Sequence, residues 1–512
     1  MPLSVLRDLG LDRFLPSIAL TLGIWTVYYF LIEPLFLSPL ARIPGPKLAA
    51  LTYWVVERHH FRETGGPWVR KLHEKYGPIV RVSPNEVDIA DPTCLAKLYG
   101  VRSPFAKPAN AAMFQNYGSE CAFSAVSRET HRTRRKFVAK FYSMSALTDH
   151  SEIIGFMRER SAMVLAKLED NEKGSVDIFT MATRYALDIV SFSVWGESLN
   201  LIGGENLEVG DHIRTIATTS VAIYRWFFWV VYFTISPFSF LAPAKLQDAL
   251  ESGSRLEKIN SEYARRAMKN AKSGDNSGMV SFMMNRKEFG SEVLSEGNVL
   301  AESCDHVLAG ADTTGATLTW LFYILAQPGN RKYQDELREE LLNLSTPLDV
   351  HEVLNASYLN RVLLEVQRLF PAGPGAIHQR EVGKNDEATF TFGSKYYKLP
   401  AGTLVGSYPY VLHYLPNVYG EDVEDFRPER WLEEDLTKLQ EMHACHIPFN
   451  TGARMCVGMN LAILEAKYLI CDVLRNYRIQ LPSSIDPSEM NPVWGGVLRP
   501  QGESCTLRFE KL

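Results

Sequence analysis

Three hydrophobic patterns follow one another along the chain. Residues 14–32 (FLPSIALTLGIWTVYYFLI) carry no charge over about 19 positions, long enough for a helix to cross the hydrocarbon layer of a membrane. Residues 77–92 alternate β-branched and polar side chains between Gly and Pro, which predicts two short strands. From residue 149 to about residue 344 most segments have apolar side chains at the helical period. One example is the long segment 255–272, which is otherwise polar. The body is therefore predicted to be mainly helical.

Strand patterns return in residues 388–412 and in the C-terminal segment 502–512. No internal repeat or low-complexity block divides the chain. We expect a mainly α fold with small β-sheets (α+β). The expected organisation is a short N-terminal segment (1–13), a transmembrane anchor (14–32), a proline-rich hinge (33–50) and one domain (51–512).

The apolar N-terminal run has two interpretations, an anchor and a cleaved signal peptide. Bulky residues follow the run where a signal peptide would have a small-residue cleavage site, so we expect a retained anchor. The following IPGPK, residues 43–47, suits a stiff exit from the membrane. Arg7 and Arg13 before the run balance Arg42 and Lys47 after it, so charge does not decide the orientation.

A second apolar stretch, residues 221–244, stays open between three assignments. It is a second span, a buried core helix, or a helix pair that dips into the membrane surface. Arg225 and Pro237 disfavour a clean span.

Composition narrows the class of protein. A net charge of -5 and 46% hydrophobic residues are ordinary for a globular protein and lack the basic excess of a nucleic-acid binder. The seven cysteines are scattered, which indicates a reducing compartment. His443, Cys445 and His446 match no common zinc spacing, so no zinc site is expected.

One cysteine stands in an unusual setting, FNTGARMCVG, residues 449–458. A thiolate that binds a large flat cofactor needs a loop without neighbouring bulk, and glycines allow such close approach. An arginine two residues before the cysteine can pair with an anionic group of the same cofactor. Haem meets each requirement, with an iron for the sulfur, a planar ring and two propionates. The alternative, an inert buried cysteine, does not account for the spacing.

This segment resembles the haem-binding signature of the cytochrome P-450 family, and all of its fixed positions are present. They are Phe449, Gly452, Arg454, Cys456 and Gly458. The resemblance implies the P-450 fold and haem b, with Cys456 as the axial thiolate ligand of the iron.

Other motifs of the family occur in its order along the chain. EVQR (365–368) and FRPERW (426–431) imply a buried structural network of Glu365, Arg368 and Arg430 that holds the cysteine loop. Taken alone, Glu365 and Arg368 could equally form a solvated pair on a helix surface.

AGADTT (309–314) resembles the oxygen motif of the family's central helix. The resemblance implies that Ala309 and Gly310 make room over the haem for dioxygen, and that Asp312 and Thr313 deliver protons to it. The simpler alternative is a kinked helix, since Gly and Thr are mediocre helix formers.

The resemblance also assigns cofactor and substrate contacts. Four side chains are expected at the haem propionates: His131 and Arg135 from HRTRR (131–135), Arg380 and Arg454. His131 stands where the family often has tryptophan, and Arg380 could instead be a surface arginine. The substrate pocket is expected to contain Phe114, Leu308, Ala309, Ile377 and Val497, a mostly apolar set that favours a lipophilic substrate. Lys107 and His378 could bind an acid, so an aromatic carboxylate remains open.

No dinucleotide-binding glycine motif is present, so electrons must come from a separate protein. The resemblance implies that this protein is the NADPH-dependent P-450 reductase, with cytochrome b5 as a second donor. The basic segment 128–141 is either the docking surface of the reductase or a solvated helix face. Lipophilic substrate and membrane lipid are the other expected partners, and nucleic acid is not one.

The chain looks most like microsomal members from filamentous fungi. We therefore expect a monooxygenase that inserts one oxygen atom from O2 into a terpenoid, polyketide or alkaloid intermediate, with hydroxylation as the default chemistry. The alternatives are a haem-thiolate isomerase or dehydratase, a benzoate-type aromatic-acid hydroxylase, and a non-enzymatic haem sensor or electron carrier. We expect a single-pass protein of the endoplasmic reticulum membrane with a cytosolic catalytic domain, so the sequons at Asn343 and Asn355 should remain without glycan.

Overall fold

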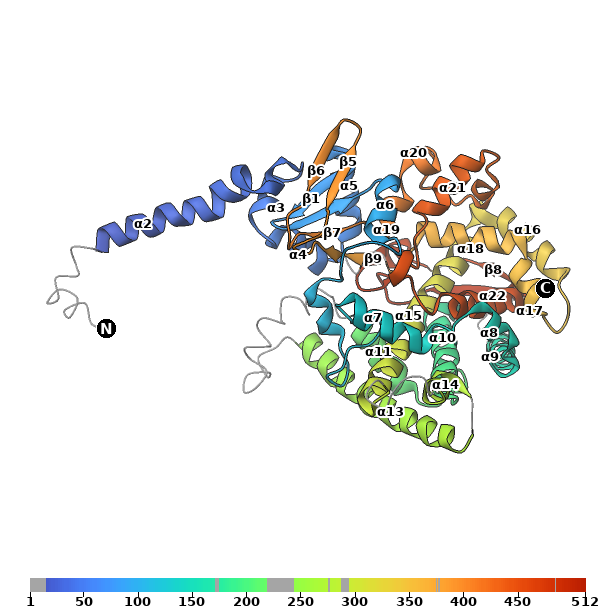
Figure 1. Cartoon of the computed structure of the whole chain (residues 1–512). Coiled ribbons are helices and arrows are strands. Elements are labelled where there is room, and N and C mark those ends of the chain that lie inside the picture. Colours follow the sequence, from blue (N-terminus) through green and yellow to red (C-terminus); the bar gives the residue numbers. More distant parts are fainter. Residues whose placement is uncertain are drawn as a thin grey trace.

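A long apolar helix projects from a mainly helical body (Figure 1). The computed structural model describes residues 15–170, 175–218, 244–274, 277–286, 294–373, 375, 378–483 and 485–512. The open stretch 221–244 thus falls, except for its last residue, outside the described residues, and so does Ile377.

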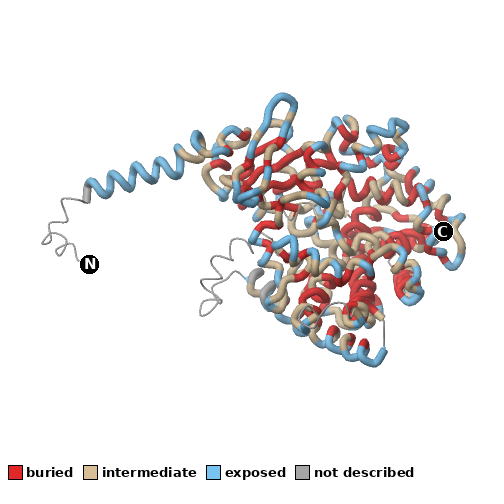
Figure 2. Tube along the Cα trace, viewed as in Figure 1, coloured by how far each residue is buried: buried red, intermediate tan, exposed pale blue. Residues whose placement is uncertain are grey.

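The projecting helix consists of α2 (Leu15–Val27), which continues as a π-helical segment, η2 (Tyr28–Leu37). Within it, Ser17–Leu37 is long and apolar enough to cross a membrane by length and composition, and none of it is buried in the protein (Figure 2). The helix runs past residue 32, where the hinge was expected to begin. Its continuation is consistent with the sequence, because residues 33–37 (EPLFL) are mostly apolar.

The end of the helix and the proline-rich segment after it are both packed against the body. The Arg81 guanidinium donates to the Pro34 carbonyl at 2.8 Å, and the Arg81 amide donates to the Pro44 carbonyl at 2.8 Å. A Cβ atom on Gly45 would lie 2.4 Å from the Arg81 carbonyl oxygen, so only glycine allows this approach. The expected hinge is therefore attached to strand β1 (Ile79–Ser83) rather than hanging free.

The principal sheet has the strand order β1-β2-β7-β4. Strand β2 (Glu86–Ile89) is antiparallel to β1 and parallel to β7 (Leu404–Gly406), and β4 (Arg380–Glu381) closes the edge. Both strands predicted within residues 77–92 are confirmed.

Smaller sheets complete the β structure. The remaining strands are β3 (Ser175–Asp177), β5 (Thr389–Phe392), β6 (Lys395–Lys398), β8 (Tyr477–Gln480), β9 (Pro492–Trp494), β10 (Leu498–Pro500) and β11 (Thr506–Lys511). Strands predicted within 388–412 and at the C-terminus are confirmed. Strand β3 was missed because three residues give no readable alternation, and only pairing with β11 defines it.

Helices make up most of the body, as predicted. They are α3 Lys47–Leu51, α4 Trp54–Phe61, α5 Gly65–Tyr76, α6 Pro92–Tyr99, α7 Arg128–Val138, α8 Met144–Asp149, α9 Ser151–Glu169, α10 Ile178–Trp195, α11 Leu207–Thr218, α13 Ala244–Lys272, α14 Gly278–Met284, α15 Glu296–Ala326, α16 Arg331–Leu342, α17 Val350–Asn355, α18 Ser357–Leu369, α19 Pro409–His413, α20 Pro416–Tyr419, α21 Leu436–Cys445 and α22 Met459–Asn476.

Helix α15 runs through the middle of the body, with α10 packed along it (Figure 1). Two glycines allow this close contact. A Cβ on Gly310 would lie 2.6 Å from Val190 Cγ2, and one on Gly315 would lie 2.7 Å from Thr183 Oγ1. Buried positions accordingly concentrate around the centre of the body (Figure 2).

Candidate functional site

The cysteine loop joins η9 (Gly452–Arg454) to the N-terminus of α22. The Cys456 amide donates to the Phe449 carbonyl at 2.8 Å, which closes the loop. The Cys456 side chain is accessible but lies deep in the protein, where burial raises the pKa of the thiol. Hydrogen bonds from the Gly458 and Met459 amides oppose that shift, as expected for sulfur at a helix N-terminus.

The two glycines of the loop have different reasons to be glycine. Gly452 has φ +70°, and a Cβ there would lie 1.9 Å from the Tyr99 carbonyl oxygen. Gly458 has an ordinary φ of -83°, and a Cβ there would meet no described protein atom within 4 Å. Protein packing therefore requires glycine only at Gly452, while a Cβ at Gly458 would enter open space.

Because only Gly452 is required by packing, alanine substitutions at the two glycines should have unequal effects on the stability of the protein. Gly452→Ala should lower the free energy of unfolding by at least about 1–3 kcal/mol, because it adds a strained backbone to a steric clash. Gly458→Ala, the matched control, should change it by less than about 0.5 kcal/mol. Urea unfolding measures both; equal losses would show that the clash at Gly452 is not the cause.

A stripe of accessible side chains interrupts the buried surface of α15. The other residues from Asp305 to Thr314, except Gly310, are buried, whereas Ala309 is exposed and Asp305, Leu308, Asp312 and Thr313 are partly accessible. Their spacing of three and four residues places them on one face of the helix. We call these five residues the accessible face of α15. The negative charge of Asp305 raises the pKa of the Cys456 thiol, so this face and the sulfur lie within electrostatic range of each other.

Within this face, the Thr313 hydroxyl donates to the Ala309 carbonyl at 2.8 Å. Burial raises the pKa of Asp312 to about 6, opposed by the charges of Arg214 and Arg499. Among the described residues, Asp312 Oδ2 has no hydrogen-bond partner. The resemblance placed Gly310 beside Ala309 on this face; Gly310 is partly accessible, and a Cβ there would meet Val190 of α10, so glycine at this position also permits the close packing of α10.

Four cations gather near the cysteine loop, namely Lys107, Arg135, Arg380 and Arg454. Burial lowers the pKa of each, and for Arg454, whose pKa falls to about 10, the charge of Arg380 contributes next. No described carboxylate lies within 4.0 Å of any of these cations. Arg380 Nη2 is buried without a described hydrogen-bond partner.

His131 lies among these cations. Burial, followed by the positive charges of Arg454, Arg135 and Lys107, lowers its pKa to about 3. The imidazole is therefore neutral at physiological pH and can donate one N–H. Together with the accessible sulfur and the open space at Gly458, this cationic cluster fits a flat cofactor with two carboxylates, which is the form of haem.

A buried ion network lies behind the cysteine loop. Arg368 forms a bidentate pair with Glu365 at 2.7 and 2.9 Å, and Arg430 Nε lies 3.3 Å from Glu365 Oε1. The Trp431 indole donates to the second Glu365 oxygen at 3.0 Å. Glu365 and Arg368 are both 0% exposed. The structure thus brings together the three residues predicted to form this network.

His413 links the network to the loop, a role that sequence reasoning missed. Its Nδ1–H donates to the Arg368 carbonyl at 3.1 Å, and its Nε2 accepts the Ile447 amide at 2.9 Å. Burial holds the pKa of His413 well below its usual range, so the ring is neutral, as this donor–acceptor pattern requires. No spacing in the sequence marks His413, because its partners are backbone groups.

The expected pocket residues come from separate elements. Phe114 ends η4 (Ala109–Phe114), and its ring meets the Phe123 ring edge-on at 5.2 Å. Leu308 and Ala309 belong to the accessible face of α15, and Val497 precedes β10.

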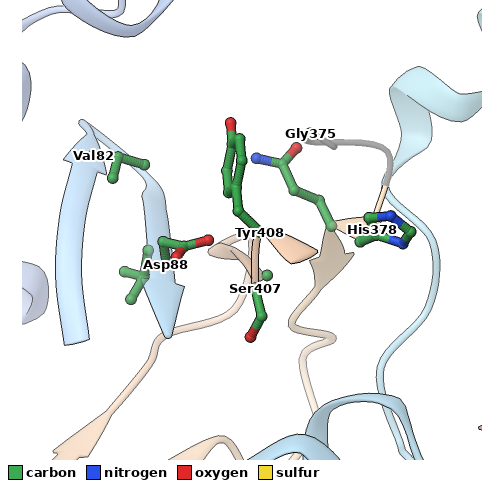
Figure 3. Close-up of a pocket in the computed structure, with 9 residues that line it drawn as sticks. Val82, Asp88, Gly375, His378, Ser407 and Tyr408 are labelled. Atoms are coloured by element: carbon green, nitrogen blue, oxygen red, sulfur yellow. The ribbon is translucent and has the colours of Figure 1, made fainter. Parts of the chain in front are cut away.

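A separate small pocket lies beside the principal sheet (Figure 3), lined by residues that include Asp88, His378 and Ser407. None of its lining residues is an expected catalytic or haem contact. Burial lowers the pKa of His378 to about 4, and its Nε2 bonds to the Gly373 carbonyl at 3.1 Å. His378 is therefore neutral and already engaged, so it does not serve as the acid-binding residue suggested by the sequence.

Comparison with known proteins agrees with this geometry. The family model of cytochrome P-450 matches residues 44–506, nearly all of the chain beyond the projecting helix. The chain is similar to the N-acetyltryptophan 6-hydroxylase ivoC of Emericella nidulans, with 29% identity over 91% of both chains. It is also similar to the cytochrome P-450 monooxygenase tazI of Aspergillus terreus, with 24% identity over 93% of this chain and 95% of that protein. A third relative, the cytochrome P-450 monooxygenase BOT1 of Botryotinia fuckeliana, is 27% identical over 89% of both chains. The relatives are fungal P-450 monooxygenases, and the chain with its α+β fold belongs to the cytochrome P-450 family.

Proposed function

We propose that this P-450 monooxygenase is anchored in a membrane and hydroxylates or otherwise oxidises a lipophilic intermediate of fungal secondary metabolism, such as a terpenoid, polyketide or alkaloid. The observation that supports this most is the accessible Cys456 sulfur, within electrostatic range of the accessible face of α15 and close to the cationic cluster.

In this proposal Cys456 would ligate the iron of haem b through its sulfur, and Arg135, Arg380, Arg454 and neutral His131 would donate to the haem propionates. The open space at Gly458 accommodates the ring. When bound, haem supplies the redox-active iron that activates dioxygen, and the thiolate increases electron density there. Phe449 closes the loop that presents the sulfur.

Asp312 and Thr313 form the proton-delivery pair. Thr313 holds its hydroxyl in place through the Ala309 carbonyl and can exchange that bond for one to dioxygen. Asp312 has a pKa of about 6, so near neutral pH it readily takes a proton from solvent and passes it on.

Thr313→Ala should uncouple the enzyme. We expect product per NADPH to fall by about 10-fold or more while NADPH consumption continues, because proton delivery by a positioned group contributes about 10²–10⁴-fold. Thr319→Ala is the matched control, since Thr319 bonds to the Gly315 carbonyl at 2.7 Å on the same helix but is fully buried. The measurement is the amount of product formed per NADPH consumed in each variant. If Thr313→Ala remains tightly coupled, Thr313 does not take part in proton delivery.

Electrons come from NADPH through a separate reductase, with cytochrome b5 as a second donor. Helix α7 and the residues after it expose Arg128, Arg132, Lys136 and Lys140, which are spaced by four and form one basic stripe. This stripe suits an acidic partner.

Reversing a charge on this basic stripe should weaken the association of the protein with its reductase. Arg132→Glu is expected to raise the KM for reductase several-fold at low salt and to flatten its salt dependence. Arg255→Glu on α13, where Arg255 is 61% exposed, is the control and should leave both unchanged. Reductase titrations at two ionic strengths measure this; identical behaviour of the two variants would place docking elsewhere.

The carbon-monoxide difference spectrum of the reduced protein, together with product analysis, tests the proposal. A thiolate-type band and product that depends on O2, NADPH and reductase are expected. A histidine-type band contradicts thiolate ligation, and product without O2 or electrons identifies an isomerase or dehydratase. A thiolate band without any product from candidate intermediates leaves a haem sensor or electron carrier.

Hydroxylation of an aromatic acid is a second candidate. Lys107 supports it, as a buried cation with no described carboxylate within 4.0 Å. A relative with 29% identity is named an N-acetyltryptophan 6-hydroxylase, and N-acetyltryptophan is an aromatic acid.

We place the protein in the endoplasmic reticulum membrane, with Ser17–Leu37 as the single described span and the catalytic domain in the cytosol. The side chains of Asn343 and Asn355 are exposed, so both sequons are physically open to modification. If the catalytic domain is cytosolic, as we propose, neither asparagine should carry a glycan.

A further inference from the structure

Three buried polar side chains connect α15 to the segment that follows α7. Glu302 and His306 lie one turn apart on α15 and are 0% and 8% exposed, and Tyr142, between α7 and α8, is 2% exposed. His306 Nε2 lies 3.5 Å from Glu302 Oε1, and His306 Nδ1 is hydrogen-bonded to the Tyr142 hydroxyl at 2.8 Å. The rings of Tyr142 and His306 also stack, with centroids 5.1 Å apart. We call Glu302, His306 and Tyr142 the Glu302 chain.

Burial holds the members of the Glu302 chain together. A carboxylate away from water is unfavourable unless it is paired, and among the described residues His306 is the only basic side chain within 4.0 Å of Glu302. The hydrogen bond between His306 and Tyr142 forms whichever partner donates, because a phenol both donates and accepts. Breaking either contact removes a partner from a buried polar group, so each side chain keeps the next in place.

The Tyr142 end of the chain reaches the helix that follows the cysteine loop. Asn460, in the first turn of α22, donates from Nδ2 to the Tyr142 carbonyl at 2.9 Å. Asn460 lies four residues after Cys456, and Gly458 and Met459, whose amides bond to the sulfur, lie between them. The position of these two amides is therefore tied to α15 through Asn460 and Tyr142.

Glu302 also fixes the segment that contacts the other side of the cysteine. The Ala122 amide donates to both Glu302 oxygens, at 3.1 and 3.2 Å. Shortly after it, the carbonyls of residues 125 and 126 accept hydrogen bonds from Arg454 at 2.5 and 3.1 Å. Arg454 lies two residues before Cys456. One carboxylate on α15 is thus connected to both flanks of the cysteine.

We propose that His306 and Tyr142 are positioning residues for the cysteine ligand, because they hold the N-terminus of α22, and with it the sulfur, at a fixed place relative to α15. Backbone amides that point at a thiolate stabilise its negative charge, so their position determines how strongly the sulfur donates to a bound iron. The inference rests on the proposed haem-thiolate function. It adds to that function residues outside the cysteine loop, the cationic cluster and the accessible face of α15.

The reduction potential of the purified holoenzyme tests this role. Tyr142→Phe removes only the hydroxyl and keeps a ring that can stack on His306. Loosening the amides around the sulfur should let it donate more strongly, so we expect the equilibrium between ferric and ferrous forms to shift at least about 3-fold towards ferric. Direct outer-shell partners of a metal ligand typically contribute about 10–100-fold, and Tyr142 acts one step further away, through Asn460.

Asn460→Ala breaks the same connection at its other end and should shift the potential in the same direction. Because the two contacts lie in series, the double variant Tyr142→Phe with Asn460→Ala should shift the potential no further than the larger single variant does. Fully additive shifts would show that the two residues act independently, which would overturn the proposal.

Tyr185→Phe is the matched control. Tyr185 is fully buried, and its hydroxyl donates at 2.9 Å to the carbonyl of Glu465, further along α22 from the sulfur. This variant should lose resistance to urea, as Tyr142→Phe does, but keep the wild-type potential and the wild-type carbon-monoxide band. Urea unfolding is therefore measured on the same samples as the potential.

A purely structural role of the Glu302 chain would give a different result. If Tyr142→Phe unfolds at lower urea but keeps the wild-type potential and band, or if Tyr185→Phe shifts the potential as much, the proposal is wrong. Both results leave the proposed monooxygenase function intact, since the thiolate-type band remains. Absence of that band from the wild-type protein would instead count against the function itself and would remove this inference with it.

Discussion

Cys456→Ser is expected to abolish the thiolate-type carbon-monoxide spectrum and to reduce product formation by more than about 100-fold. Loss of an outer-shell partner of a metal ligand already costs about 10–100-fold, and here the ligand itself is replaced by a poor donor. The hydroxyl cannot reproduce the anionic sulfur that the Gly458 and Met459 amides stabilise.

A second cysteine provides the control for this experiment. Cys94 is also unpaired, lies on α6 and is 6% exposed, so Cys94→Ser tests the general effect of removing a buried thiol. It should retain the spectrum and most of the turnover. Unchanged absorption and turnover in Cys456→Ser would contradict the whole assignment of the cofactor site.

Glu365→Gln should destabilise the protein by about 3–5 kcal/mol, the usual cost of removing one partner from a buried ion pair. Arg368, at 0% exposure, would remain buried without its carboxylate, and Arg430, at 4% exposure, would keep only its pair with Asp422 at 2.9 Å. The Trp431 indole would also lose the charge on its acceptor. Because His413 connects Arg368 to Ile447, weaker haem retention should accompany the loss of stability.

Urea unfolding and haem retention on dilution measure these two effects. The control is Asp335→Asn, which breaks the exposed pair between Arg331 and Asp335 at 2.9 Å. Exposed pairs contribute about 0–1 kcal/mol, so this variant should remain close to wild type. Similar losses in the two variants would show that burial of the Glu365 network carries no special cost.

The fold class and the parts of the site that share a fixed spacing could be predicted from the sequence. Cys456 lies on a loop whose neighbours are set by covalent distance, and Thr313 reaches the Ala309 carbonyl through the helical period. Contacts between distant segments were less accessible. Gly310 was assigned to the oxygen side, and no pattern in the sequence indicated that its missing side chain also allows packing against Val190.

Asp305 could have been assigned to the site from the sequence but was not. One turn before Ala309, its position on the same face follows from the helical period alone. Its burial, and its negative charge within electrostatic range of the Cys456 sulfur about 150 residues later, follow only from the fold. His413 carried no such signal, since backbone groups are its partners.

Because the proline-rich segment is attached to β1, the N-terminal helix is joined to the body rigidly and not through a flexible linker. Arg81 fastens Pro34 and Pro44 to a sheet whose far edge, β4, carries Arg380 beside the cofactor site. In the membrane that we propose for this helix, its tilt would set the orientation of the whole body. The attachment would then also determine which side of the protein faces the bilayer, and so the route by which lipophilic molecules enter.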